Sequence, residues 1–500
     1  MKNLYLSLLG VCLISTIVFG QNRYKYPRGI IEGEDIELKT IPQKAPLTRN
    51  FYVNVTKSAS IKNYAPTPQS QGNYGTCTGW AVAYAARTIL EAQHQGWSDK
   101  STITKNAFSP TFQYRLANPS SASCKGAAIS KAIQSLYTTG SVPMNSFFLN
   151  KVDNVMCPSY PMQSYNYTIA KKYKIEEYTA LWENDYSDNQ SKVNRVKKSI
   201  SEKKPIIIAM ICPNSFDDVG KDGLWRPTEN PYDKINGRQH GRHAMCVVGY
   251  DDSKYGGAFE IQNSWGTTWG DNGYVWIKYS DFSRFVYQAF ELVQLPKPKP
   301  QMPLLAGSLR LYDMDDNVNL KVNLAAKERN WTVVNPPLPS PNTTANYTYK
   351  VVPTLLSGSK MRMYLKSEQP AFVYMLGTGS VDKSVNKLFP VDGISPAMNY
   401  SSSEVALPSE KHFFQMDNTE GKSYIIVIFS KEKLDINTIK STIDNSKGNV
   451  SQRVRAAIGN KLIDPKHILL DKNEISFKVE QNHTTQKTFA MIIEFNQVNR

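Results

Sequence analysis

The sequence predicts an α+β fold in which a helical region and a β-rich region are followed by a separate β-rich domain. An Ala-rich apolar run after Cys77 and an amphipathic run over residues 127–137 predict helices. From residues 205–210 onward, apolar runs of strand length alternate with Gly and Asn turns. Alternating prolines in residues 296–303 predict a stiff linker before the last domain.

The N-terminus predicts export. Residues 1–20 combine a basic start, an apolar core and a small final residue, which is typical of a secretory signal peptide, so the mature chain is expected to begin at Gln21. A lipid anchor at Cys12 is the less favoured alternative, because Val11 is a poor residue before a lipidated Cys. No other run approaches the ~20 apolar residues of a transmembrane segment. We therefore expect a secreted, periplasmic or cell-surface protein.

Three segments supply the parts of a cysteine hydrolase: a thiol, an imidazole and two amides. A nucleophilic Cys needs a thiolate stabilised by an imidazolium and a helix N-terminus, and Cys77 opens a predicted helix. His243 stands before the apolar strand of residues 244–248, where a rigid sheet holds a reacting group accurately. Asn263 is a candidate to orient the imidazole, and Gln71 adds a second amide.

Cys77 and the histidines have alternative interpretations. Without the other two segments, Cys77 would be interpreted as a buried thiol of the hydrophobic core. His94 is excluded as the base, because seventeen residues of helix place it about 25 Å from Cys77. His240 lies in a polar, Gly-containing run and remains the alternative base.

The three segments resemble the papain family of cysteine peptidases, and the resemblance covers roughly residues 58–295. In that family a Gln lies six residues before the nucleophile, a His opens a strand that continues into Gly-Tyr, and an Asn begins Asn-Ser-Trp-Gly. The resemblance implies a papain-like two-lobe fold with the active site in the groove between the lobes. It also implies that Cys77 attacks the peptide carbonyl, His243 is acid and base, Asn263 orients the ring, and Gln71 with the Cys77 amide forms the oxyanion hole.

Three further residues are expected in the substrate cleft. By the resemblance, Trp265 covers the Asn263–His243 hydrogen bond, and Gly126 belongs to a Cys-x-Gly turn at the cleft wall. Arg242 directly precedes His243. Its side chain is either a solvated arginine or a basic cleft group that favours acidic substrates.

The cysteine count fits an exported protein with a reactive thiol. Removal of residues 1–20 leaves an odd number of cysteines, which predicts one free thiol, Cys77, and an even remainder. The resemblance implies a Cys124–Cys157 disulfide, and Cys246 reads as a core side chain within an apolar strand. No CxxC spacing or Cys/His cluster is present, so neither a metal nor another cofactor is predicted.

Residues 304–500 carry alternating apolar and polar runs between Pro, Gly and Asn turns, which predict a β-rich accessory domain with a binding or spacer role. Its turn at Leu388-Phe389-Pro390 weakly resembles accessory domains of bacterial exported proteins. The formal charge of +16 predicts affinity for an acidic surface or polymer, with a solubilising surface as the alternative. The basic residues are scattered, so no nucleic-acid partner is predicted.

Two function classes follow. The first is an exported papain-like peptidase that hydrolyses peptide or protein substrates through a Cys77 acyl-enzyme. The second is a binding or adhesion protein that uses a papain-like scaffold, with the C-terminal domain as the functional module. The complete set of Gln71, Cys77, His243 and Asn263 favours the first class, because a scaffold has no need of all four. The leader of residues 21–57 is shorter than the helical prodomains of many relatives, so it either restrains the cleft in another way or leaves the enzyme active.

Overall fold

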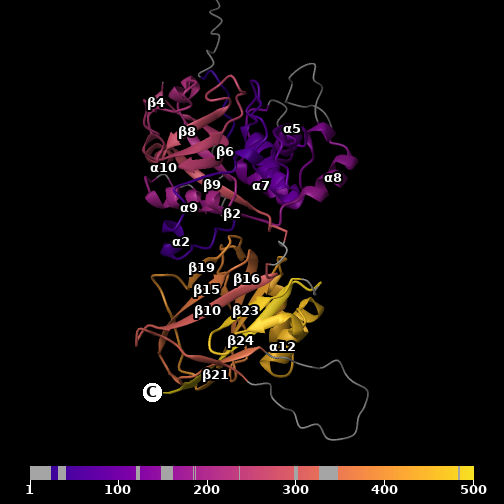
Figure 1. The fold of residues 1–500 in the computed structure, drawn as a ribbon, viewed down its shortest axis with the longest axis vertical. Helices are drawn as coiled ribbons and strands as arrows, with labels where there is room; N and C mark the ends of the chain where they lie inside the picture. The colour runs from indigo at the N-terminus through magenta and orange to yellow at the C-terminus, as the bar shows by residue number, and fades with distance from the viewer. Residues whose placement is uncertain are drawn as a thin grey trace, which may run out of the picture.

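The computed structural model places a helix-and-sheet unit above a β-sandwich unit (Figure 1). The described residues are 24–31, 41–119, 124–147, 162–297, 302–325, 347–481 and 485–499, apart from 184, 186 and 236. The predicted signal peptide and residues 298–301 of the predicted linker lie outside them. Among the helices in these ranges, none has the length and apolar character needed to cross a membrane.

One long buried helix carries the predicted nucleophile at its first residue. It runs through α3 (Cys77–Gly79), a π-helical stretch (Trp80–Arg87) and α4 (Thr88–Gln95), and it ends at Gly96, whose φ of 70° is left-handed. A Cβ at Gly79 would lie 2.1 Å from the carbonyl oxygen of Pro110, so glycine lets α3 pack directly on α6 (Pro110–Ala117). The amphipathic helix predicted from residue 127 is α7 (Ile129–Thr138), which begins two residues later.

An antiparallel sheet faces this helix. Its strands, in spatial order, are β2 (Glu177–Trp182), β9 (Val286–Val293), β3 (Ile206–Cys212), β6 (Gly241–Asp251), β7 (Ala258–Gln262) and β8 (Tyr274–Lys278), with β1 (Ser58–Ser60) on β6. Ala81, Val82 and Ala85 share one core with Ile208 and Met245 of the sheet. In Figure 1 the helices α5 (Lys100–Lys105) and α7 lie on one side and the sheet on the other. The predicted α+β class is therefore confirmed.

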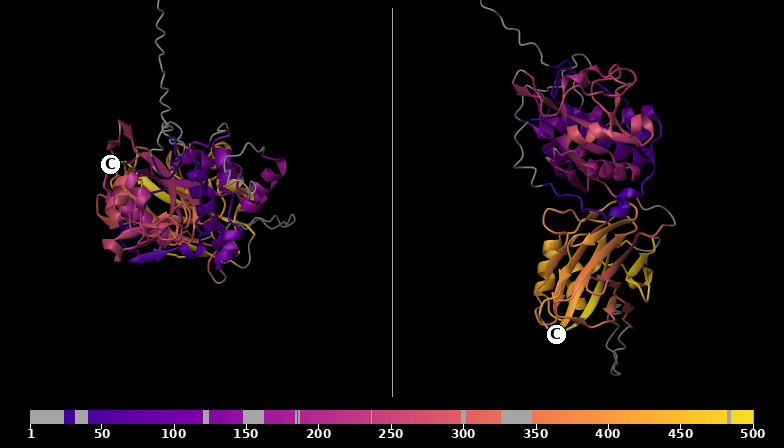
Figure 2. Two further views of the ribbon diagram at one scale, coloured as in Figure 1. Left: turned by 90° about the horizontal axis from the view of Figure 1, so that it is seen from above. Right: turned by 90° about the vertical axis from the view of Figure 1, so that its left-hand side faces the viewer.

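The C-terminal unit is a sandwich of two sheets. The strands of the first sheet, in spatial order, are β19 (Ser403–Leu407), β15 (Lys360–Ser367), β10 (Leu305–Asp313), β23 (Ser476–Val479) and β22 (Ile468–Leu470). The strands of the second sheet are β12 (Val322–Leu324), β13 (Thr348–Val351), β24 (Thr488–Val498), β21 (Gly421–Ser430), β16 (Ala371–Gly379) and β17 (Asn386–Phe389). Alternate residues such as Met363 on β15 and Met375 on β16 fill the space between the sheets. On the other face of β16, Tyr374 shares a hydrophobic core with residues of α11 (Ile436–Asn445) and α12 (Val450–Ile458). The right-hand view of Figure 2 shows the two units from the side.

Residues 41–53, which we call the junction segment, bind both units. The ammonium of Lys44 lies 2.6 Å from Oε1 of Glu291 on β9 and 2.5 Å from Oδ1 of Asn399 in the sandwich unit. Burial lowers the pKa of Lys44 to about 8. The hydroxyl of Tyr400 donates to Oε2 of Glu291 at 2.9 Å. The segment ends in α2 (Arg49–Val53), which lies between the units in Figure 1.

The cysteines depart from the predicted count of one free thiol. Cys77, Cys212 and Cys246 are all free and buried. Cys212 ends β3 and Cys246 lies within β6, and their register partners are Gly241 and Ile207, so the two thiols do not face each other across the strands. Cys124 is disulfide-bonded. The expected partner, Cys157, lies outside the described residues, so the Cys124–Cys157 pairing stays a prediction.

Candidate active site

Cys77 lies where the long helix meets the sheet. Its side chain is completely buried at the start of α3, beside the backbone of Ala244 on β6. Burial raises the pKa of the Cys77 thiol to about 11, while the backbone N–H groups of Ala244 and Gly29 act in the opposite direction. In this enclosed state the thiol is therefore protonated at neutral pH.

His243 is held by Asn263 across β6 and the end of β7. Nε2 of His243 lies 2.7 Å from Oδ1 of Asn263, and this oxygen also accepts from the Ser264 N–H at 2.7 Å. Nδ1 has no hydrogen-bond partner among the described residues, so it is the nitrogen left for a thiol. Burial, together with the charge of Arg28, lowers the pKa of His243 to about 3. The imidazole is therefore neutral here.

Gln71 is anchored to the chain that carries Asn263. Its N–H donates to the Ser264 carbonyl at 2.8 Å, and its Oε1 accepts from the Ser264 hydroxyl at 2.6 Å. Its Nε2 donates to the Tyr74 carbonyl at 2.7 Å. An amide NH₂ has two hydrogens, so one donor remains after this contact. Four sequence-predicted residues are thus fixed around one helix-to-sheet contact.

Trp265 and Gly126 both contact the first described residues of the chain. The Trp265 ring lies 4.7 Å from the His243 ring, at 30°, and covers it from one side. On its other face Trp265 stacks on Tyr26, with ring centroids 4.6 Å apart. A Cβ at Gly126 would lie 2.9 Å from the Ile31 side chain and 3.0 Å from the Gly29 carbonyl oxygen. Both residues are therefore covered by an earlier part of the chain, and their place in a substrate cleft stays a prediction.

Arg242 contributes its backbone to the cleft. Its guanidinium lies 4.9 Å from the ring of Tyr287 on β9. Because neighbouring residues of a strand point to opposite faces, this side chain and His243 lie on different faces of β6. The structure therefore does not place the guanidinium where a basic cleft would need it. The Arg242 carbonyl instead accepts from the Ile30 N–H at 3.3 Å.

The remaining histidine alternatives lie elsewhere. Nε2 of His240 lies 3.1 Å from the Asn230 carbonyl oxygen, so this ring belongs to a loop contact. His94 lies in the last turn of α4, at the opposite end of the helix from Cys77.

Residues 24–31, which we call the cleft segment, run across the site. Gly29 lies at Cys77, and its carbonyl accepts from the Ala127 N–H at 2.9 Å. A Cβ at Gly29 would lie 2.2 Å from the Gly75 carbonyl oxygen, so only glycine fits there. Because Ala127 binds the Gly29 carbonyl, that carbonyl is not presented to the oxyanion donors. The segment thus covers the thiol without offering it a bond to cut.

Sequence reasoning left the role of the leader open and did not find this contact. The cleft segment contacts residues more than 180 positions away in the sequence, such as Asp217, and no local sequence pattern predicts such pairs. The combination of a glycine with flanking Arg28 and aromatic residues was the only signal present.

Acidification is expected to weaken the docking of the cleft segment. His243 has a pKa of about 3 while covered, against 6.5 for an ordinary histidine. The uncovered state therefore binds more protons between these values. Docking is strongest above pH 6.5 and weakens as pH falls toward 3, by up to about tenfold per pH unit. Hydrogen exchange of residues 24–31, corrected for the intrinsic rate, measures this.

The groups that act on the pKa of His243 in the covered state are Asn263 and Arg28. Cys77 affects docking only at alkaline pH. Because burial raises the pKa of its thiol, docking weakens only as the pH rises above 9.0, the ordinary pKa of a cysteine. A His243→Ala variant is the control and should lose the acid dependence. Protection that is constant from pH 7 to 4 in the unmodified chain would contradict the expectation.

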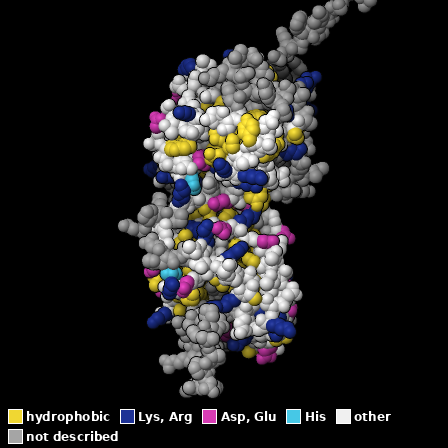
Figure 3. Space-filling view, turned by 90° about the vertical axis from the view of Figure 1, so that its right-hand side faces the viewer, with side chains coloured by type: hydrophobic (Ala, Val, Ile, Leu, Met, Phe, Trp, Pro, Cys, Tyr) yellow, Lys and Arg dark blue, Asp and Glu magenta, His cyan; other side chains and the backbone are white. Residues whose placement is uncertain are grey.

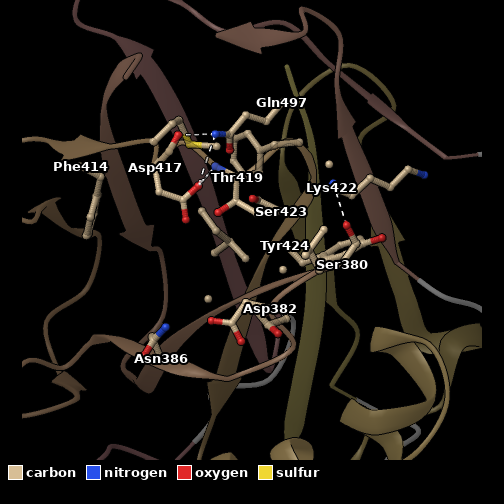
Figure 4. Close-up of a pocket in the computed structure, with 18 of the residues that line it drawn as sticks. Ser380, Asp382, Asn386, Phe414, Asp417, Thr419, Lys422, Ser423, Tyr424 and Gln497 are labelled. Carbon is tan, nitrogen blue, oxygen red and sulfur yellow. Dashed lines mark hydrogen bonds between the residues drawn. The ribbon is translucent and has the colours of Figure 1, made fainter. Parts of the chain in front are cut away.

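The sandwich unit has a separate hollow of about 250 Å³ between the ends of β16 and β21. Figure 4 shows Asp382 and Asp417 on opposite rims, with the ammonium of Lys422 extending away. Its described lining contains neither His nor Cys, so it does not repeat the thiol and imidazole of the candidate active site. Within the described ranges, no group of three or more His, Cys, Asp or Glu could hold a metal ion.

Comparisons with known proteins agree with this geometry. Residues 60–286 match the family model described as papain family cysteine protease. The chain is 26% identical over 211 residues to a peptidase C1-like protein of Acanthamoeba polyphaga mimivirus, covering 41% of this chain and 61% of that protein. It is 25% identical over 246 residues to a cathepsin L-like peptidase of Aedes aegypti, covering 48% and 64%. The chain thus spans about three fifths of the length of these relatives.

Among solved structures, xylellain, a cysteine protease from Xylella fastidiosa, aligns with 55% of this chain and 98% of its own, at 21% identity and a TM-score of 0.43.

Proposed function

We propose that this chain, whose residues 60–286 form a papain-family cysteine peptidase domain, is an exported peptidase kept latent by its own cleft segment. One observation carries the proposal: the 2.7 Å bond from Asn263 fixes His243, whose Nδ1 has no partner among the described residues, directly before Ala244, whose backbone N–H acts on the buried Cys77 thiol at the start of a helix. A thiol, a fixed imidazole and a helix N-terminus are what a thiolate nucleophile requires. Export rests on the sequence of residues 1–20.

The reaction begins when the cleft segment leaves. Water then reaches both groups, the burial that raises the pKa of Cys77 and lowers that of His243 is relieved, and a proton passes from sulfur to Nδ1. The Cys77 thiolate attacks the peptide carbonyl, and His243 protonates the amine as the C–N bond breaks. A water that gives its proton to His243 then attacks the thioester, which releases the acid and restores the thiol.

Two amides assist these steps from fixed positions. The N–H of Gln71 that Tyr74 does not take, together with the Cys77 backbone N–H, donates to the oxyanion of each tetrahedral intermediate. Asn263 keeps the ring in one orientation while Trp265 covers their hydrogen bond from water. These roles account for why Cys77 begins a helix and His243 lies on a strand, with Asn263 directly after β7, because such elements hold reacting groups accurately.

The sandwich unit is proposed to bind and not to catalyse. Its hollow offers carboxylates and hydroxyl groups without a histidine or a cysteine. On the face drawn in Figure 3, Lys and Arg side chains are spread over both units with Asp and Glu among them, so the charge of +16 is not gathered into one patch there. Attachment to an acidic surface or polymer would therefore use dispersed contacts.

A peptidyl epoxide distinguishes this peptidase from a scaffold protein. In the full chain carrying Gly29→Val, which cannot seat the cleft segment, we expect alkylation of Cys77. Cys246 is the matched control in the same molecule, because its thiol is free and buried within β6, whereas Cys212 contacts Arg28 of the cleft segment. Mass mapping of peptides reads the modified residue. Equal labelling of all three thiols, or sparing of Cys77, would contradict the proposal.

A further inference from the structure

The cleft segment buries an arginine in a pocket beside the catalytic pair. The side chain of Arg28 is 4% exposed. Its guanidinium lies 5.1 Å from the Trp265 ring, the ring that also covers His243. Its charge is close enough to lower the pKa of His243. This pocket therefore belongs to the substrate cleft itself.

The wall of the pocket presents only hydrogen-bond acceptors to the arginine. Nη1 of Arg28 lies 2.7 Å from Oδ1 of Asp217, Nη2 donates to the Pro213 carbonyl at 2.9 Å, and Nε donates to the Cys212 carbonyl at 3.3 Å. Oδ2 of Asp217 accepts from the Lys25 N–H at 2.9 Å. All these donors come from the cleft segment. When the segment leaves, the Asp217 carboxylate and two carbonyls lose these donors.

The peptidase domain holds Asp217 in place without the segment. Asp217 lies in a short 3-10 helix (Asn214–Asp218) directly after β3. The preceding Phe216 is fully buried, and its ring packs 5.6 Å from Trp265 and 5.2 Å from Trp269. The position of the carboxylate is therefore set by the aromatic cluster and the strand. A substrate would meet a preformed acceptor site.

The pocket lies on the side of the cleft that receives the leaving group. Along the cleft segment, Arg28 precedes Gly29 at Cys77, whereas Ile30 and Ile31 follow it at the wall formed by Gly126 and Ala127. The Arg28 pocket shares Trp265 with His243, and His243 is the group that protonates the leaving amine. The amine half of the substrate must therefore approach this pocket.

We propose that Asp217 makes the peptidase select substrates with arginine on the leaving-group side of the cleaved bond. This inference rests on the proposed peptidase function and adds its substrate class. An uncompensated buried carboxylate is costly, so a side chain that pairs with it gains a strong, charge-assisted bond. Arginine also supplies the planar fork that the two carbonyls accept. The sequence-based expectation of a basic cleft around Arg242 is thereby replaced by an acidic one.

The test uses the full chain with Arg28→Ala and Gly29→Val, so that its own arginine does not compete. Peptides that differ only in the first leaving-group residue, with arginine, lysine, citrulline or glutamate, are compared by kcat/KM. Citrulline is the matched neutral analogue of arginine. We expect arginine to exceed citrulline by about 10- to 100-fold, the range of a hydrogen bond between charged groups. Lysine should fall between them, and glutamate should be cleaved most slowly.

Asp217→Asn in this background should reduce the preference for arginine over citrulline to less than about threefold. Asp218→Asn is the matched control, because it removes the same charge from the adjacent, exposed residue and should keep the preference. Equal cleavage of arginine and citrulline peptides, or a preference that survives Asp217→Asn, would overturn the inference.

A binding measurement separates this inference from the proposed function. With Cys77→Ala added, calorimetry of the same peptides should show selective binding of arginine that Asp217→Asn removes. If no peptide is hydrolysed by any variant but this selectivity is found, the peptidase proposal fails and the arginine site stands. If peptides are hydrolysed but binding shows no dependence on Asp217, the arginine site fails and the peptidase stands.

Discussion

Replacement of Gly29 by valine is expected to raise the hydrolysis rate of the full chain at neutral pH by at least about 100-fold. A Cβ at this position would lie 2.2, 2.3 and 2.7 Å from three backbone atoms of Gly75, which cannot move aside as a flexible side chain would. The cleft segment must then leave, and a loss of docking free energy of about 2.7 kcal/mol already corresponds to that factor. Cleavage of a fluorogenic peptide measures the rate.

Gly220→Val is the matched control for this prediction. Gly220 is exposed, and the Cβ added there would meet only an Asp222 oxygen, at an ordinary 3.6 Å. This variant should stay as latent as the unmodified chain. If Gly29→Val is as slow as Gly220→Val while its melting temperature is unchanged, the cleft segment does not control the activity.

The second large effect concerns the nucleophile and its base. In the Gly29→Val background, Cys77→Ala and His243→Ala should each lower kcat by at least about 10⁴-fold, because each is one half of a unit that fails as a whole. Combining them should cost little more than either change alone. Single-turnover assays with the same fluorogenic peptide measure the loss.

Cys246→Ala provides the control for removal of a buried thiol. Cys246 is as buried as Cys77 and lies in β6, but it faces the core of the sheet. Its replacement should lower the melting temperature and leave kcat nearly unchanged. Turnover of the Cys77→Ala variant at a rate similar to that of Cys246→Ala would rule out Cys77 as the nucleophile.

Each part of the site could be predicted because each lies in a short segment with a recognisable pattern of its own. Cys77 opens a helix whose apolar pattern is readable, and Asn263 begins a segment distinctive enough to indicate the papain family, which the match over residues 60–286 confirms. The pairing of His243 with Asn263 follows once both are assigned to neighbouring strands, and the structure places them 2.7 Å apart. Their catalytic roles stay a prediction until they are tested.

The contacts that were missed join distant parts of the chain. Arg28 and Asp217 are 189 residues apart, and each reads as an ordinary solvated charge in its own neighbourhood. The side chain of Arg242 could not be assigned to a face, because its strand register is set by pairing with Ile211 on β3. Sequence alternation likewise predicted strands such as β15, but not that β15 pairs with both β10 and β19.

In the proposed latent state the inhibitor belongs to the same chain, so inhibition would be independent of protein concentration, and the Lys44 contacts at the junction would shorten the tether. Because the junction segment stays bound to Glu291 and Asn399, a displaced cleft segment remains tethered by residues 32–40 alone. Such a short tether keeps the local concentration of the inhibitor on the order of millimolar. Eight residues that would bind weakly as a separate peptide can therefore occupy the cleft almost continuously, and dilution does not activate the enzyme. A single cut between Ile31 and Ile41 would convert this reversible equilibrium into an irreversible loss of the inhibitor by diffusion.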